Sequence, residues 1–111
     1  MGYDLHVTRK KFWATDGPPI TAQEWLAYVA ADPQLRLDPN SKRHSVTIVG
    51  IPSQYPEPWI EWFEDDIYTK NPDEPILAKM QQIASALGAR VQGDDGEIYR
   101  SAKLDDFYHE D

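Results

Sequence analysis

The segment from Asn71 to Gly88 constrains the fold of this chain most strongly, because it carries a start signal, an apolar face and a stop signal for one helix. Asn71 can cap the helix and Pro72 suits its first position. Asp73 and Glu74 follow where the helix dipole favours negative charge. Apolar side chains then recur at helical spacing, at Ile76, Leu77, Met80, Ile83, Ala84 and Leu87. Gly88 suits the left-handed residue that ends a helix, and the apolar face requires a second layer to cover it.

A second helix is predicted between Thr21 and Ala31. Thr21 and Glu24 have the spacing of a capping box, in which each side chain accepts a hydrogen bond from the other residue's backbone. The helix is expected to stop at Asp32, because Pro33 cannot continue it. Its buried stripe is expected to comprise Ala22, Trp25, Leu26 and Val29.

Short runs of alternating or β-branched residues predict six strands around these helices. The strands are expected at 3–8, 45–50, 59–64, 67–70, 89–92 and 97–101. Asp65-Asp66 and residues 93–96 are expected to be hairpin turns, and the polar segment 32–44 and the proline-rich segment 52–58 to be loops. In the strand that follows, Trp59, Glu61 and Phe63 would face one way, and Ile60, Trp62 and Glu64 the other.

The element order β-α-β-β-β-α-β-β predicts one α+β domain over residues 1–111, with an antiparallel or mixed sheet and two amphipathic helices. Residues 102–111 are expected to form an acidic, partly ordered tail. The predicted core comprises Leu5, Val7, Trp25, Leu26, Val29, Val46, Ile48, Leu77, Met80, Ile83 and Leu87.

Negative charge is concentrated in the second half of the chain. The net charge is −8, and residues 61–111 carry all of it, with thirteen acidic against five basic residues. Such a balance disfavours binding to nucleic acid and to anionic membranes, and it favours a basic protein partner. The alternative is that the acidity only keeps the protein soluble. No secretory signal is visible at the N-terminus and the apolar runs are short, so a cytoplasmic protein is expected.

The residue types offer little for metal, cofactor or catalytic chemistry. The 111 residues include no cysteine, which excludes thiolate ligands and cysteine nucleophiles. His6, His44 and His109 are far apart in the sequence, and His6 is expected to face solvent from its strand. Asp94 and Asp95 fit an ordinary turn better than a calcium loop. We therefore expect no metal, no cofactor and no catalytic residues.

The segment 55–68 is the main candidate for a binding site, because it interleaves aromatic and acidic residues. Both faces of its strand carry a tryptophan, so one of them must lie against a helix, a loop or a partner. Aromatic side chains often anchor protein interfaces. The predicted partner-binding residues are Tyr55, Glu57, Trp59, Glu61, Trp62, Glu64, Asp65 and Asp66.

Several short motifs resemble those of a group of small uncharacterised bacterial proteins. They are Gly2-Tyr3-Asp4-Leu5-His6, Glu24-Trp25-Leu26, Asn71-Pro72-Asp73-Glu74, Lys79-Met80, Leu87-Gly88-Ala89 and residues 91–97. The resemblance implies a bacterial cytoplasmic protein, and it implies no activity or cofactor. In type, though not in motif, a small acidic bacterial domain is similar to the immunity proteins that inhibit toxins.

These observations predict an acidic binding protein that inhibits a basic partner, with a toxin–immunity pair as the concrete case. One alternative is a small-molecule-binding or enzymatic domain whose aromatic residues line a pocket. A second alternative is a structural subunit that buries the aromatic strand in a homodimer.

Overall fold

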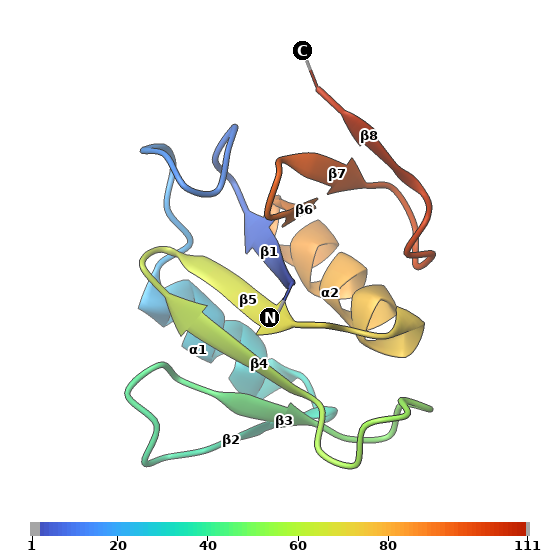
Figure 1. The fold of residues 1–111 in the computed structure, drawn as a ribbon. Helices are drawn as coiled ribbons and strands as arrows, with labels where there is room; N and C mark the ends of the chain where they lie inside the picture. Colours follow the sequence, from blue (N-terminus) through green and yellow to red (C-terminus); the bar gives the residue numbers. More distant parts are fainter. Residues whose placement is uncertain (1–2, 111) are drawn as a thin grey trace.

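The computed structural model describes residues 3–110, and within them the chain forms eight strands and two helices (Figure 1). Gly2 of the N-terminal motif and Asp111 of the tail lie outside the described residues. The strands are β1 (Asp4–Thr8), β2 (Leu35–Leu37), β3 (Val46–Ile48), β4 (Trp59–Phe63), β5 (Asp66–Lys70), β6 (Arg90–Gly93), β7 (Glu97–Tyr99) and β8 (Phe107–His109), and the helices are α1 (Ala22–Ala31) and α2 (Glu74–Leu87).

All strands join one antiparallel sheet in the order β2-β3-β4-β5-β1-β6-β7-β8. The predicted α+β class is confirmed, and the sheet is antiparallel. The predicted element order is present, with β2 and β8 as additions. β1 lies at the centre, between β5 and β6, although it comes first in the chain.

The two additional strands lie in segments that were expected to be loop and tail. β2 occupies part of segment 32–44 and pairs with β3, but only Leu35 of its three residues is buried. β8 pairs with β7 along the acidic tail, and its three residues are all exposed. Each strand is only three residues long, which is too short for a recognisable strand pattern in the sequence.

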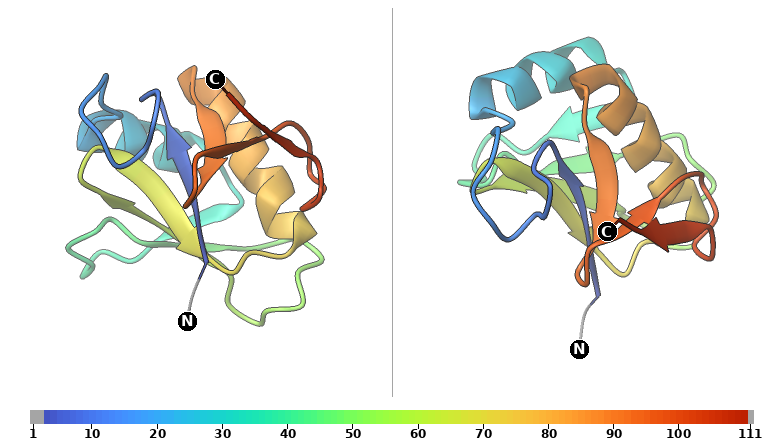
Figure 2. Two further views of the ribbon diagram at one scale, coloured as in Figure 1. Left: turned by 45° about the horizontal axis from the view of Figure 1, so that its top comes forward. Right: turned by 90° about the horizontal axis from the view of Figure 1, so that it is seen from above.

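Both helices lie on the same side of the sheet (Figure 2). The core forms between them and the inward-facing strand residues, and it includes Leu5, Val7, Trp25, Ile60, Leu77 and Met80. The prediction that Leu26 belongs to the core is wrong, because its side chain is only partly buried and does not pack against the core cluster. Leu87 is also only partly buried, but it packs at the edge of the core. Neither helix within residues 3–110 is long and apolar enough to cross a membrane.

The predicted N-terminal cap is present in α1 but not in α2. The capping box of α1 is present, with Thr21 Oγ1 accepting from the Glu24 backbone at 3.1 Å. α2 instead begins after Asp73, whose carboxylate accepts from the Ile76 backbone at 3.2 Å. The prediction that Asn71 and Pro72 start this helix is therefore wrong. Asn71 lies outside it with a φ of +48°, and its side chain accepts from the Tyr3 backbone at 2.9 Å.

Within residues 3–110 no helix covers the other side of the sheet, and we call this side the open face. Strand alternation places Trp59, Glu61 and Phe63 of β4 on this face, while Ile60 and Trp62 point into the core side. The loop between β1 and α1 folds over part of the open face, where its Trp13 stacks on His6. The remaining part of the face is open to a ligand or a partner.

Candidate functional site

A groove on the open face has a volume of about 570 Å³. It runs between the Trp13 loop and the β4–β5 hairpin. Its lining includes five carboxylates and three cations, which are Asp4, Asp16, Glu64, Asp65, Asp66, Lys10, Arg43 and Lys70. The aromatic rings of Trp13, Phe63 and Tyr68 complete it. The groove therefore combines a negative balance of charge with apolar surface.

The β4–β5 turn forms one rim of the groove. Glu64 and Asp65 occupy the turn with φ angles of +49° and +71°, and both are exposed. The prediction of a turn at Asp65-Asp66 is wrong by one residue, because Asp66 is the first residue of β5 and pairs with Phe63. Two left-handed residues match the twist of a two-residue hairpin turn. The turn thus presents the carboxylates of Glu64 and Asp65, and Asp66 belongs to the strand.

Asp66 lies on the floor of the groove and is only 5% exposed. Its Oδ2 is 3.3 Å from Lys10 Nζ, and both side chains are buried. Its Oδ1 has no hydrogen-bond partner among residues 3–110. Burial raises the pKa of Asp66, and the nearby Thr8 hydroxyl and the Lys10 charge only partly offset this.

Glu61 is held by partners within the protein. Tyr68 Oη donates to Glu61 Oε1 at 2.6 Å, and Arg43 donates to Tyr68 Oη at 2.7 Å. The Arg43 guanidinium also lies 4.0 Å from the centroid of the Phe63 ring. Burial and the Glu61 hydrogen bond raise the pKa of Tyr68. These contacts fix the charged and aromatic wall of the groove.

The remaining predicted site residues lie elsewhere. Tyr55, Glu57 and Trp59 line a separate notch of about 420 Å³ at the other end of β4. Trp62 packs against the core, and its Nε1 donates to the Ile20 carbonyl at 2.8 Å. The structure thus divides the predicted site into the groove, the notch and the core, and it identifies Trp62 as the tryptophan on the helix side.

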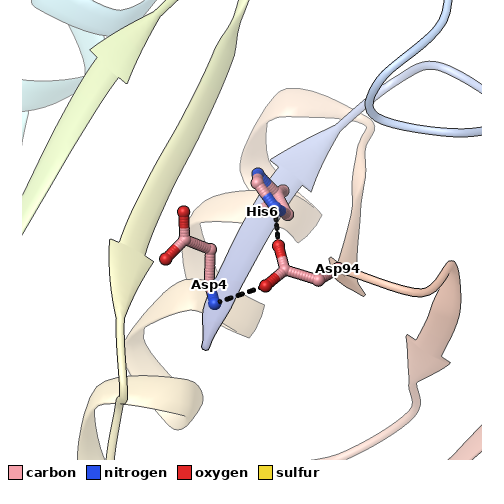
Figure 3. A group of neighbouring side chains, drawn as sticks. All are labelled: Asp4, His6 and Asp94. Atoms are coloured by element: carbon pink, nitrogen blue, oxygen red, sulfur yellow. Dashed lines mark hydrogen bonds and ion pairs between the residues drawn. The ribbon is translucent and has the colours of Figure 1, made fainter. Parts of the chain in front are cut away.

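A second cluster on the open face surrounds His6, which is 5% exposed (Figure 3). The expectation that His6 faces solvent is wrong. It does point away from the core, but the Trp13 ring covers it, with centroids 3.9 Å apart and an angle of 8° between the planes. His6 Nε2 lies 3.0 Å from Asp94 Oδ1, while Asp94 Oδ2 accepts from the Asp4 backbone at 3.0 Å.

Long-range contacts hold the Trp13 loop in place over this cluster. The Trp13 indole donates to the Asp94 carbonyl at 3.0 Å, and its backbone donates to Gln92 Oε1 at 2.7 Å. Trp13 is therefore a further residue of the open face that the sequence analysis missed. Its only local signal is an adjacent aromatic pair, Phe12-Trp13, within a polar loop.

Comparison with known proteins gives no relative from which to transfer a role. No protein-family model, curated protein or solved structure matches the chain. The function is therefore inferred from the groove and its surroundings.

Proposed function

We propose that this protein binds a cationic segment of a protein partner in the open-face groove and thereby blocks it. The observation that carries the proposal is the exposed Glu64-Asp65 turn beside Phe63, a residue that lines the groove and is 41% exposed. Exposed carboxylates accelerate the encounter with a basic surface, and an exposed aromatic ring supplies an apolar anchor. A bacterial immunity protein that occludes the cationic site of a toxin is the concrete case.

Some of the charges that line the groove are already paired with one another. Lys10 is paired with Asp66 and Lys70 with Asp4, whereas Arg43 donates to the neutral Tyr68 hydroxyl and keeps its charge. Glu64 and Asp65 form no side-chain ion pair among the described residues, so the rim retains two carboxylates that are available to a partner. Phe63 and Glu64-Asp65 therefore replace Trp62 as the proposed contact residues.

An NMR titration locates the binding surface. The probe is a synthetic decapeptide that alternates arginine and glycine, added to ¹⁵N-labelled protein, with a glutamate–glycine decapeptide as the control. We expect shifts centred on residues 63–66 and 13–16, which weaken as salt is added because exposed charges are screened. Shifts confined to the tail beyond residue 101, or spread evenly over all acidic residues, would contradict binding in the groove.

The immunity hypothesis makes a separate biological prediction. The neighbouring gene should encode a basic toxin, and co-expression of the present protein should restore growth to cells that express that toxin. Replacing Phe63 by Ala should weaken this rescue. If the product of the neighbouring gene is not toxic, the immunity hypothesis is wrong. The proposal of binding in the groove is then tested by the peptide titration alone.

The notch supports the alternative of a small-molecule ligand. Pro56, Pro58, Trp59 and Ile76 give it an apolar lining, and Tyr55 is fixed by a 2.7 Å hydrogen bond from its hydroxyl to the Asn71 carbonyl. An apolar, partly enclosed site of this kind suits a flat aromatic compound. Binding of 8-anilinonaphthalene-1-sulfonate that is lost in Trp59→Ala, in a protein that stays folded, would favour this second function.

A further inference from the structure

The cluster of Asp4, His6 and Asp94 has the composition of a metal site. One possible ligand atom from each of the three side chains lies within 4.8 Å of the other two (Figure 3). We propose that these three side chains bind a divalent transition-metal ion of the zinc or manganese class. The site does not depend on the proposed protein partner.

The spacing of two of the three ligands already suits one ion. His6 Nε2 and Asp94 Oδ1 are 3.0 Å apart. Two ligands that each bind a tetrahedral zinc ion at about 2.0–2.2 Å are themselves about 3.3–3.6 Å apart, so His6 and Asp94 need to separate by only a few tenths of an ångström for an ion to replace the hydrogen atom between them. The hydrogen bond therefore prepares the pair for metal binding instead of opposing it.

The third ligand requires a small rearrangement that the structure permits. Asp4 pairs with Lys70 at 3.1 Å, but the Lys70 side chain is 53% exposed. Exposed ion pairs contribute little to stability, so a divalent ion can displace the Lys70 ammonium from the carboxylate at low cost. Asp4 then closes on the ion from the same strand as His6.

Contacts around the cluster hold the ligands in position. Trp13 fixes the plane of the His6 ring by stacking, and the Asp4 backbone and the Trp13 indole bind the side chain and the carbonyl of Asp94. Metal ligands oriented by such outer contacts bind more tightly than flexible ones. His6 and Asp94 are thus held in position before any ion arrives, and only the Asp4 side chain must move.

An independent observation on the groove floor also suggests a missing cation or donor. Asp66 lies on the open face next to His6, is 5% exposed and leaves Oδ1 without a partner among residues 3–110. Buried polar atoms usually have a hydrogen-bond partner, so Asp66 Oδ1 leaves an acceptor at the floor of the groove for a water or another donor.

The ligand set indicates the class of ion. Imidazole favours zinc and similar transition metals, whereas two carboxylates also suit manganese. Three protein ligands leave coordination positions open, and these face the groove because Asp4 and His6 line it. Magnesium and calcium are poorer candidates, since they prefer ligand sets made of oxygen alone.

The test is isothermal titration calorimetry with Zn²⁺ on protein first dialysed against a chelator. We expect one Zn²⁺ per chain in the wild-type protein, and Asp94→Asn should raise the dissociation constant at least tenfold. Asp95→Asn is the matched control, because Asp95 is exposed in the same turn and outside the ligand set, and it should change the constant less than twofold. Failure of the wild type to bind, or equal constants in the two variants, would overturn the proposal.

Histidine NMR separates this site from adventitious binding at His44 or His109. Zn²⁺ should shift the Nε2 resonance of His6, and Asp4→Asn should weaken that shift. A shift of His44 or His109 alone overturns the proposal. Because the readout needs no substitution of His6, it remains decisive even if replacing the buried His6 prevents folding. The arginine peptide is absent throughout, so the result is distinct from that of the partner titration.

Discussion

At the scale of single residues, the ion pair between Lys79 and Asp32 is buried like that between Lys10 and Asp66, and its two charged atoms lie closer together. Lys79 Nζ lies 2.7 Å from Asp32 Oδ2, and Lys79 is only 3% exposed. Burial would raise the pKa of Asp32, but hydrogen bonds from Lys79, Gln34 and Tyr28 hold that pKa below its usual value. The pair joins the end of α1 to the middle of α2.

Replacing Lys79 by Met should destabilise the protein by about 3–5 kcal/mol, because it leaves the Asp32 carboxylate buried without its partner. Chemical denaturation measures the loss. Lys42→Met is the control, since Lys42 is exposed, and it should cost less than about 0.5 kcal/mol. Equal stability of the two variants would mean that the Lys79 pair contributes nothing.

Trp62 and Phe63 are neighbours in β4 that point to opposite faces of the sheet. Trp62→Ala should cost about 3 kcal/mol of stability, because it removes a ring that packs on the core, and should leave peptide binding nearly unchanged. Phe63→Ala should cost under about 1 kcal/mol but should weaken binding of the arginine peptide. Thermal denaturation measures the loss of stability, and the peptide titration measures the loss of binding. If Trp62→Ala weakened binding and Phe63→Ala weakened stability, Trp62 would be the contact residue and Phe63 the core residue.

The ion pair of Glu24 with Arg9 predicts a pH dependence. The hydrogen bond from Arg9, at 2.6 Å, lowers the pKa of Glu24 to about 2 from a usual 4.5. A carboxylate with a depressed pKa in the folded state contributes stability above pH 4.5, and this contribution is lost as the pH falls towards 2. In Glu24→Gln the stability should therefore fall less steeply between these pH values. Urea denaturation at several pH values measures the free energy of unfolding. If it falls with pH as steeply in Glu24→Gln as in the wild type, this pair is not formed in solution.

At the scale of elements, the start of α2 shows what a local pattern can and cannot predict. Asn71 and Asp73 are both good cap residues, and the sequence alone favoured the first. The structure uses Asp73, whose Oδ2 also binds Ser53 and the Gln54 backbone, each at 2.8 Å. Asn71 instead ties the end of β5 to the start of β1 through Tyr3. The choice depends on residues that are distant in the sequence.

Asp73→Ala should destabilise the protein by about 1–2 kcal/mol through loss of the cap. Asn71→Gly is the comparison, because glycine tolerates the φ of +48° at this position and keeps the backbone contact to Tyr3. We expect it to cost less than the Asp73 change in urea denaturation. A larger loss of stability in Asn71→Gly than in Asp73→Ala would contradict the assignment of Asp73 as the more important of the two residues.

At the scale of the whole molecule, local signals were sufficient for the fold class but not for the site. Capping residues and strand alternation act over a few positions, so the two helices and six of the strands could be predicted. The insertion of β1 between β5 and β6 depends on tertiary packing. The same insertion brings His6 next to Asp94, 88 residues away, and Trp13 next to Gln92. Residues scattered in the sequence could therefore not be recognised as one cluster.

The distribution of charge is the feature that connects the sequence to the proposed function. The acidic second half of the chain contributes the exposed turn of the groove, but it also contributes exposed carboxylates far from it, such as Asp105. Net charge alone would attract any basic molecule. Only a comparison between variants of equal charge can separate binding in the groove from general attraction.

The most direct measurement is therefore the affinity of the arginine–glycine decapeptide for two variants that each lose two negative charges. Glu64→Gln with Asp65→Asn removes the charges of the turn, and Asn is well suited to its left-handed backbone. Asp38→Asn with Asp105→Asn removes two exposed charges outside the groove. We predict that the first variant raises the dissociation constant at least fivefold over the second, which corresponds to about 1 kcal/mol. Equal affinities would contradict the groove as the binding site.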